Sequence, residues 1–437
     1  MSPLPLVDAH ACAQFGAVCR GPGPRAWCIE GTRRADAQAR ASARDRDNAR
    51  VRPSATPFAA PAPRSASAGL PAVLLAVVLG LAGCGTPGPG AGEAGLGPAQ
   101  ARALVEQLLP ERLRDRAGWA ADLTAALGAL ELPATAANLC AVLAVTEQES
   151  GYQVDPQVPG LGAIARKEID RRAERAGIPA LAVRAALALS SSDGRSWAER
   201  LEGVQTEREL SELYEDFIEG VPLGRSFLAD RNPVRTGGPM QVGVAFAQEH
   251  ARAHRYPYPM RGSVRTEVFT RRGGLYFGAA HLLAYRAPYG RMIHRFADFN
   301  AGRWASRNAA FQQALARLVG RPLALDGDLL PPPGSGVVGQ TERAALDVAA
   351  RLDLSPAAVR RELEQGSGPD FEASELYRRV FAQAEKQGGR ALARAVLPRI
   401  DLQSPKFTRK LTTEWFARRV DERHARCLGR AQALQDG

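Results

Sequence analysis

A glutamate at the end of an apolar helix is the residue of this chain best placed for acid–base chemistry. Glu149 closes an apolar run whose members recur at helical spacing and predict one buried stripe: Leu139, Val142, Leu143 and Thr146. A buried carboxyl group is costly, so a glutamate at the edge of such a stripe is either paired with a cation or held protonated for use as an acid. Taken alone, a partly exposed glutamate before a glycine stop is the better interpretation.

Two later segments give this glutamate a context. Residues 237–242 read Gly-Gly-Pro-Met-Gln-Val, a glycine turn that runs into an apolar stretch. Residues 299–302 read Phe-Asn-Ala-Gly and follow an amphipathic segment at 275–296. Each motif alone is common at turns and helix ends, so the informative feature is the order of the three.

In this order, Glu-Ser-Gly, Gly-x-Met-Gln-Val and aromatic-Asn-Ala-Gly resemble the motif set of the lysozyme-like lytic transglycosylases, the SLT and goose-type lysozyme-like enzymes that cleave peptidoglycan. The resemblance covers roughly residues 135–155 and 235–315. About 80 residues separate its halves, more than those enzymes usually have there. With this insertion and the closing segment 404–417, the whole pattern resembles DUF1615, an uncharacterised family of bacterial lipoproteins.

The lytic transglycosylase resemblance implies a reaction that needs a single acid. The acid protonates the departing oxygen of the MurNAc–GlcNAc bond, then removes a proton from the C6 hydroxyl of the muramic acid, which leaves a 1,6-anhydro end. Glu149 would take both roles, with its pKa raised by the apolar stripe. The resemblance gives substrate-binding roles to Ser150, Gly238, Met240, Gln241, Phe299 and Asn300.

Two departures from that pattern leave a second function open. Phe299 stands where these enzymes commonly carry tyrosine, and Pro239 stands where leucine is more usual. Another tyrosine could replace the lost hydroxyl, and the candidates are Tyr152, Tyr285 and Tyr289. The alternative function is that of a non-catalytic peptidoglycan-binding or scaffold lipoprotein of the cell envelope.

Other titratable residues are weaker candidates for the site. Glu147 lies about 200° around the helix from Glu149, so it points away if Glu149 faces the substrate. Of the histidines, only His250 and His254 share a spacing that could bind a metal, and with no third ligand evident we expect surface residues there. We expect no metal and no cofactor. The acidic residues of a helix at 207–220 are expected to form a solvated face: Glu215, Asp216 and Glu219.

An apolar segment near the N-terminus predicts export. Residues 74–80 form a short apolar core that follows Arg52 and Arg64 and leads into Leu-Ala-Gly-Cys, which matches the bacterial lipobox. This core is too short to span a bilayer and has the layout of a removable signal. We therefore expect a lipoprotein signal peptide at 51–83, a mis-annotated or non-functional extension at 1–50, and lipidation of Cys84.

The position after the lipobox cysteine and the remaining cysteines bear on location. Gly85 follows Cys84, which resembles outer-membrane sorting, so we expect a lipid anchor at the periplasmic face of the outer membrane. Cys140 and Cys427 are then an even pair in an oxidising compartment. A disulfide between them and two separately buried thiols both fit this arrangement.

The charge balance argues against a nucleic-acid partner. The chain has a formal net charge of +11, and residues 1–83 hold ten arginines against five acidic residues, so the mature chain retains about +6. Its basic residues are scattered and almost all arginine, with four lysines in total, which indicates codon bias more than a binding stripe. A mild positive charge suits the expected partner, the anionic glycan strands of peptidoglycan.

Helical periodicity without sustained β alternation predicts a mostly α fold. After a lipidated cysteine and flexible tether at 84–97, we expect a lysozyme-like domain at 98–324 with a helical insertion at about 156–234. A Pro/Gly linker at 325–340 precedes a C-terminal helical region at 341–437, which is either a separate module or a collar packed on the first. Within this region Ser355 and Pro356 read as the N-cap and first residue of a helix.

Overall fold

The computed structural model describes residues 95–220, 228, 231–260, 262–402 and 410–436. This part of the chain is mostly α-helical, as predicted. Its named strands form two short antiparallel pairs, β1 (Thr236–Gly237) with β2 (Val242–Gly243), and β3 (Asp401–Leu402) with β4 (Leu411–Thr412). The expected signal peptide, Cys84 and the extension at 1–50 lie outside the described residues. Within those residues, no helix has the length and apolar content that crossing a membrane requires.

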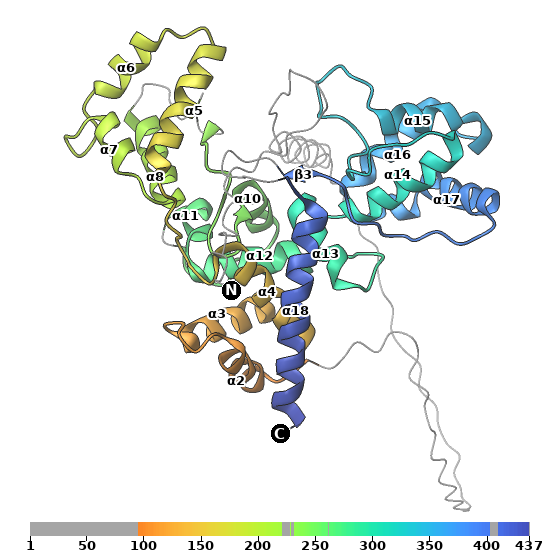
Figure 1. Ribbon diagram of the computed structural model, residues 1–437, viewed down its shortest axis with the longest axis horizontal. Coiled ribbons are helices and arrows are strands. Elements are labelled where there is room, and N and C mark those ends of the chain that lie inside the picture. Colours follow the sequence, from red (N-terminus) through yellow and green to blue (C-terminus); the bar gives the residue numbers. More distant parts are fainter. Residues whose placement is uncertain (1–94, 221–227, 229–230, 261, 403–409, 437) are drawn as a thin grey trace, which may run out of the picture.

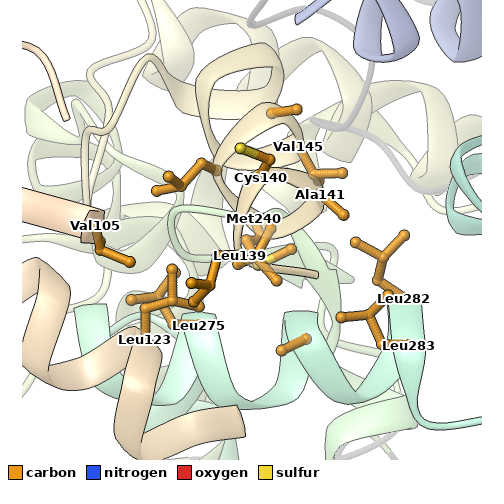
Figure 2. Packing of buried hydrophobic residues seen from close by; sticks show 14 of the residues in the cluster. Val105, Leu123, Leu139, Cys140, Ala141, Val145, Met240, Leu275, Leu282 and Leu283 are labelled. Carbon is orange, nitrogen blue, oxygen red and sulfur yellow. The ribbon is translucent and has the colours of Figure 1, made fainter. Parts of the chain in front are cut away.

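The central core brings helices from both ends of the chain together. It is formed by buried side chains of α2 (Pro98–Leu108), α3 (Arg116–Ala129), α4 (Ala136–Ser150), α12 (Arg271–Leu283), α13 (Met292–Ala301) and α18 (Thr413–Asp436). Figure 1 shows the long α18 running beside α4 and α13, and both pairs are in contact. In Figure 2, Leu139, Met240 and Leu275 meet in this core.

The insertion has its own small core. It contains α5 (Leu161–Arg175), α6 (Ala180–Ala188), α7 (Trp197–Gly203) and α8 (Glu207–Gly220). Trp197, Leu201 and Leu210 are buried there together with Phe269, which lies outside the insertion and joins it to the rest of the molecule. Next to it, α10 (Val244–Ala253) and α11 (Val264–Val268) pack with α12 around Tyr276 and Phe277.

The C-terminal core is built on α14 (Ala305–Val319). Three later helices pack around it: α15 (Gln340–Val348), α16 (Pro356–Glu364) and α17 (Glu375–Gly388). Short 3₁₀ turns join them at Ala350–Leu352, Gln365–Ser367 and Pro369–Ala373. Leu329, within the expected linker, is buried in this core. The region 341–437 therefore divides: α15 and α17 pack on α14, with α16 against both of them, whereas α18 returns to the central core. Figure 1 shows the insertion and α14–α17 on opposite sides of the central core.

Two helix starts follow local sequence signals, and one expected helix is divided. The predicted cap at Ser355 is confirmed, since its side chain accepts a hydrogen bond from the amide of Ala358, with Pro356 as the first helical residue. The α4 helix begins after Thr135, whose hydroxyl caps the amide of Asn138. The expected amphipathic segment at 275–296 is instead parts of two helices, α12 and α13. Pro288 lies in the connection, and proline disfavours helical conformation at itself and at the residue before it.

Candidate functional site

Glu149 lies buried in the last turn of α4. The helix stops directly after it, because Gly151 adopts a left-handed conformation with φ of 58° and its amide bonds to the carbonyl of Glu147. The Glu149 side chain is 5% exposed. Burial, and secondly the charge of Glu207, raise the pKa of this carboxyl from 4.5 to about 8. Glu149 is therefore mainly protonated at neutral pH, as a general acid must be.

Glu147, the rival acid, faces a different partner. Its carboxylate is half-exposed and lies 3.4 Å from Arg423 Nε and 3.9 Å from an Arg426 guanidinium nitrogen, both on α18. This is the orientation expected from the angle between the two glutamates on α4. Glu147 therefore connects α4 with α18 as a half-exposed ion pair.

A second buried carboxyl, which no sequence motif marks, comes from the insertion. Glu207 is the first residue of α8 and is 6% exposed. The Thr206 hydroxyl accepts a hydrogen bond from the amide of Glu209 and so begins this helix just before Glu207. Acidic residues in a first helical turn are a common helix-start signal, which is why Glu207 is not conspicuous in the sequence.

The start of α8 is fixed to the segment that follows α4. The amide of Val158 donates to the carbonyl of Gln205 at 2.8 Å, and the Gln157 side-chain amide donates to Gln205 Oε1 at 3.1 Å. An ion pair joins Arg208 to Asp155 at 2.8 Å. These contacts tie the start of α8 to residues 155–158, in the segment that follows α4.

The glycine turn forms the tip of the β1–β2 hairpin. Gly238 has φ of 72°, and an added Cβ there would overlap the carbonyl oxygen of Val268, so glycine is required on both counts. Gln241 also has positive φ, at 49°. Its side-chain amide donates to the carbonyl of Gly238 at 3.4 Å, and its Oε1 accepts from the Thr236 hydroxyl at 3.1 Å. Gln241 thereby holds the turn closed.

The hairpin tip packs on a glycine face of α12. An added Cβ on Gly274 would overlap the ring of Pro239, and one on Gly278 would overlap the sulfur of Met240. Met240 itself is fully buried in the central core. Glycines spaced four apart on one helix face are visible in the sequence, and they could have predicted this close approach. Since α12 contacts α4, β2 and α13, it is the common support of all three motifs.

The remaining residues with implied substrate-binding roles have partners within the protein. The Ser150 hydroxyl donates to the carbonyl of Thr146 at 3.1 Å. Asn300, near the end of α13, accepts a hydrogen bond from the hydroxyl of Thr413, the first residue of α18, at 2.9 Å. The ring of Phe299 lies 5.2 Å from that of His281 in an edge-on contact.

The three tyrosines considered as replacements for the missing hydroxyl donate to other groups. Tyr152, which follows the end of α4, donates its hydroxyl to the carbonyl of Leu143 in that helix at 3.2 Å. Tyr285, at 2.9 Å, and Tyr289 both donate to the buried carboxyl of Asp298. That carboxyl also accepts from the backbone amides of 304 and 306, so it anchors the start of α14. Burial raises its pKa to about 7.

The expectation of surface histidines is wrong for His250. Its ring is buried and stacks on that of His254 at 4.2 Å between centroids. Its Nε2 lies 3.3 Å from the hydroxyl of Tyr276. Burial lowers the pKa of His250 to about 4, so the ring is neutral at physiological pH. Across the described residues, no group of three side chains has the arrangement of a metal site.

The expectation of a solvated acidic face on α8 is wrong for two of its three residues. Glu215 accepts a hydrogen bond from the Asn232 side chain at 2.7 Å, and Asp216 pairs with Arg200. Both carboxylates are half-buried between α8 and its neighbours, whereas Glu219 is exposed. These pairs stabilise the insertion.

A cleft of about 810 Å³ lies within the insertion. Its walls come from residues 157–167 and 198–205, and Lys167 and Glu202 are among its charged side chains. Gln157 and Gln205, which join the insertion to the segment after α4, also line it. None of the residues with sequence-predicted roles lies in its wall.

A disulfide ties α4 to the C-terminal helix. Cys140 and Cys427 are bonded across 287 residues of sequence, with their Cα atoms 5.6 Å apart. This settles the choice between a disulfide and two free thiols that the sequence left open. Stable disulfides are typical of oxidising compartments, so the bond indicates an extracytoplasmic location.

Comparisons with known proteins place the chain in a family. The model of a family described as "Protein of unknown function (DUF1615)" matches residues 112–430. The "Uncharacterized protein YaiW" of Escherichia coli (strain K12) is 50% identical over 359 residues, which cover 82% of this chain and 98% of that protein. No solved structure matches the chain significantly.

Proposed function

The chain belongs to the DUF1615 family, and we propose that it cleaves peptidoglycan glycan strands as a lytic transglycosylase with a lysozyme-like catalytic domain. The observation that supports this most is Glu149, a buried carboxyl that keeps its proton at neutral pH and ends a core helix. The common support of the three motifs by α12 adds to it, because the residues that match the enzyme pattern belong to one packed unit.

The proposed reaction uses Glu149 twice. The protonated carboxyl first gives its proton to the glycosidic oxygen between MurNAc and GlcNAc, and the bond from that oxygen to C1 breaks. The resulting carboxylate then takes the proton of the MurNAc C6 hydroxyl, and that oxygen bonds to C1. The product is a 1,6-anhydro end, and the carboxyl returns to its protonated form. No water and no second carboxylate take part as reactants, in contrast to most glycoside hydrolases.

A digestion experiment tests this proposal. The purified full chain is incubated with sacculi, and the released muropeptides are identified by mass spectrometry. We expect 1,6-anhydro products from the wild type and none from Glu149→Gln. The matched control is Glu147→Gln, two residues away and paired with α18, which should retain turnover. Equal release by the wild type and Glu149→Gln would refute the assignment.

We also propose that the chain is lipid-anchored through Cys84 at the periplasmic face of the outer membrane. The lipobox supports this, and the Cys140–Cys427 bond agrees with export. More than one acyl chain is expected, because a single chain binds a bilayer only marginally. Labelled palmitate should enter the wild type and not Cys84→Ser. Labelling of the serine variant would contradict the anchor.

The second candidate function is a non-catalytic peptidoglycan-binding lipoprotein. It is favoured by the side chains of Ser150 and Asn300, which bond within the protein, and by Phe299, which supplies no hydroxyl. This function predicts that wild type and Glu149→Gln bind sacculi equally and that neither releases products.

A further inference from the structure

The insertion carries a helix that is apolar on both its inner and its outer side. The sequence of α6 is Ala-Leu-Ala-Val-Arg-Ala-Ala-Leu-Ala, in which Arg184 is the one charged residue. Its inner side packs on the insertion, since Val183 is buried and Leu187 lies against the insertion core. At about 100° per residue, Leu181 and Ala185 lie on the opposite side, and both are exposed. A helix that is apolar all round is normally covered on all sides.

Large apolar side chains are exposed together at this helix. The described part of the chain exposes seven of them, and three lie within residues 178–189: Ile178 at 48%, Leu181 at 70% and Leu189 at 63%. Scattered exposed apolar residues are normal on a protein surface, whereas a group of them marks a binding site. Figure 1 shows α6 at the outer edge of the insertion, away from α4 and α12 of the central core. The surface formed by Ile178, Leu181, Ala185 and Leu189, here the α6 surface, is therefore directed outward.

Charged side chains border the α6 surface. Ile178 lines a hollow of about 630 Å³ between α5 and α6. The charged residues in the wall of the same hollow are Lys167, Asp170, Arg171 and Glu174. Across residues 161–189 there are six basic and three acidic residues, so the formal net charge of this segment is +3.

The arginines of α5 remain accessible to a partner. Arg171, Arg172 and Arg175 each keep more than half of their side-chain area exposed. All three pair with the same carboxylate, that of Glu168, so one negative charge is shared among three guanidinium groups. Guanidinium groups bind phosphate oxygens through charge-assisted hydrogen bonds, so this excess of positive charge is complementary to a surface of phosphate groups.

The size and composition of the α6 surface disfavour a protein partner. The helix has nine residues and is about 14 Å long, so its outer side is much smaller than the about 800 Å² that each partner of a stable dimer buries. Protein interfaces depend on aromatic anchors as well as arginine, and residues 161–190 contain no aromatic residue. Leucine beside arginine is instead typical of helices that lie in the interface of a bilayer.

We infer that the α6 surface docks on an anionic phospholipid bilayer. Leu181 and Leu189 enter the boundary between headgroups and acyl chains, and the arginines of α5 contact lipid phosphate groups. The contact uses side chains of the folded chain and is separate from the proposed lipid on Cys84. Together the two contacts restrict the orientation of the protein on the membrane, and only this consequence rests on the proposed anchor.

Vesicle binding by a chain without the lipid tests the inference. A chain that begins at Gly85 is used, because the apolar segment 74–80 would bind lipid by itself, and the four hydrophobic cores lie within residues 96–431. It is mixed with vesicles of phosphatidylcholine that contain or lack phosphatidylglycerol, and the bound fraction is measured by co-sedimentation. We expect binding to the anionic vesicles that weakens as salt is added, and weaker binding to phosphatidylcholine alone.

Substitutions separate the apolar contribution from the charge. Replacing Leu181 and Leu189 by alanine should weaken binding about tenfold for each leucine. Replacing Arg172 and Arg175 by glutamine should weaken it about fivefold for each arginine, with less dependence on salt. The matched control is Leu434→Ala, which changes an exposed leucine on α18 and should bind as the wild type does. Because Leu181 and Leu189 are exposed, the double alanine variant should keep the melting temperature of the wild type.

Three results would overturn the inference. They are an absence of wild-type binding across the lipid series, equal binding by the wild type and the double alanine variant, and a dimer in analytical ultracentrifugation that the two alanines dissociate. The last result would make α6 an interface between copies of the chain. A failure of Cys84 to incorporate palmitate would remove the proposed anchor and leave this measurement unaffected, since the chain tested begins after Cys84.

Discussion

Replacing Glu149 by glutamine should change how stability depends on pH. In the folded protein the pKa of Glu149 is about 8, whereas in the unfolded chain it is near 4.5. Between these values the folded state binds one proton more than the unfolded state, so the free energy of unfolding falls as pH rises. The stabilising contribution is complete below the unfolded pKa and is lost as pH passes through the folded pKa. Glutamine does not titrate and lacks this dependence.

The size of the effect follows from the two pKa values. Their difference of 3.5, at about 1.4 kcal/mol for each pH unit, gives about 5 kcal/mol. Chemical denaturation of wild type and Glu149→Gln at a series of pH values, from about pH 4 to about pH 9, measures it. The difference between the two proteins cancels other titrating groups, including Asp298. We expect Glu149→Gln to gain stability relative to the wild type as pH rises.

Glu147→Gln is the control for this measurement. Glu147 is half-exposed and pairs with Arg423 at the surface of α18, so its replacement should change stability by about 1 kcal/mol or less across the same range. Parallel pH curves for wild type and Glu149→Gln would refute the reasoning, because they would show an ordinary carboxyl at this position.

Three further predictions concern the packing around the site. Replacing Cys140 and Cys427 by serine should lower the free energy of unfolding by about 2–4 kcal/mol in urea, and no loss would mean that packing alone holds α4 to α18. Asp298→Ala leaves buried donors without their acceptor and should cost about 3 kcal/mol or more in the same assay, whereas a loss below about 1 kcal/mol would contradict its anchoring role. Gly278→Ala should lower the melting temperature, because the added Cβ would overlap Met240 of the hairpin. Gly128→Ala, whose Cβ would meet open space, should raise the free energy of unfolding by up to about 1 kcal/mol. Stabilisation by both variants would contradict the close approach of the hairpin to α12.

The features predicted from sequence are those that depend on neighbouring residues. The stripe that buries Glu149 and the cap at Ser355 arise within a turn or two of helix, so periodicity and capping chemistry suffice to find them. The sequence pattern does not predict the break between α12 and α13, although Pro288 lies within it. An amphipathic pattern continued on both sides and obscured the local signal.

Features that depend on contacts between distant parts of the chain could not be predicted from the sequence in the same way. The Cys140–Cys427 bond requires α18 to return to the central core from beyond α14–α17, and spacing alone carries no such information. The burial of Glu207 likewise depends on how α8 packs in the folded chain. The sequence predicts a surface residue at His250, because nothing near it in the chain indicates that Tyr276 of α12 packs against its ring.

Digestion of purified glycan strands in water enriched in ¹⁸O tests the central claim most directly. A lytic transglycosylase closes the MurNAc end with the sugar's own C6 oxygen, whereas a hydrolase adds oxygen from water. We predict that the wild type releases 1,6-anhydro ends without ¹⁸O and that Glu149→Gln releases no product. Reducing ends that contain ¹⁸O, or unaltered strands with the folded wild-type protein, would contradict the assignment of Glu149 as the single acid of a lytic transglycosylase.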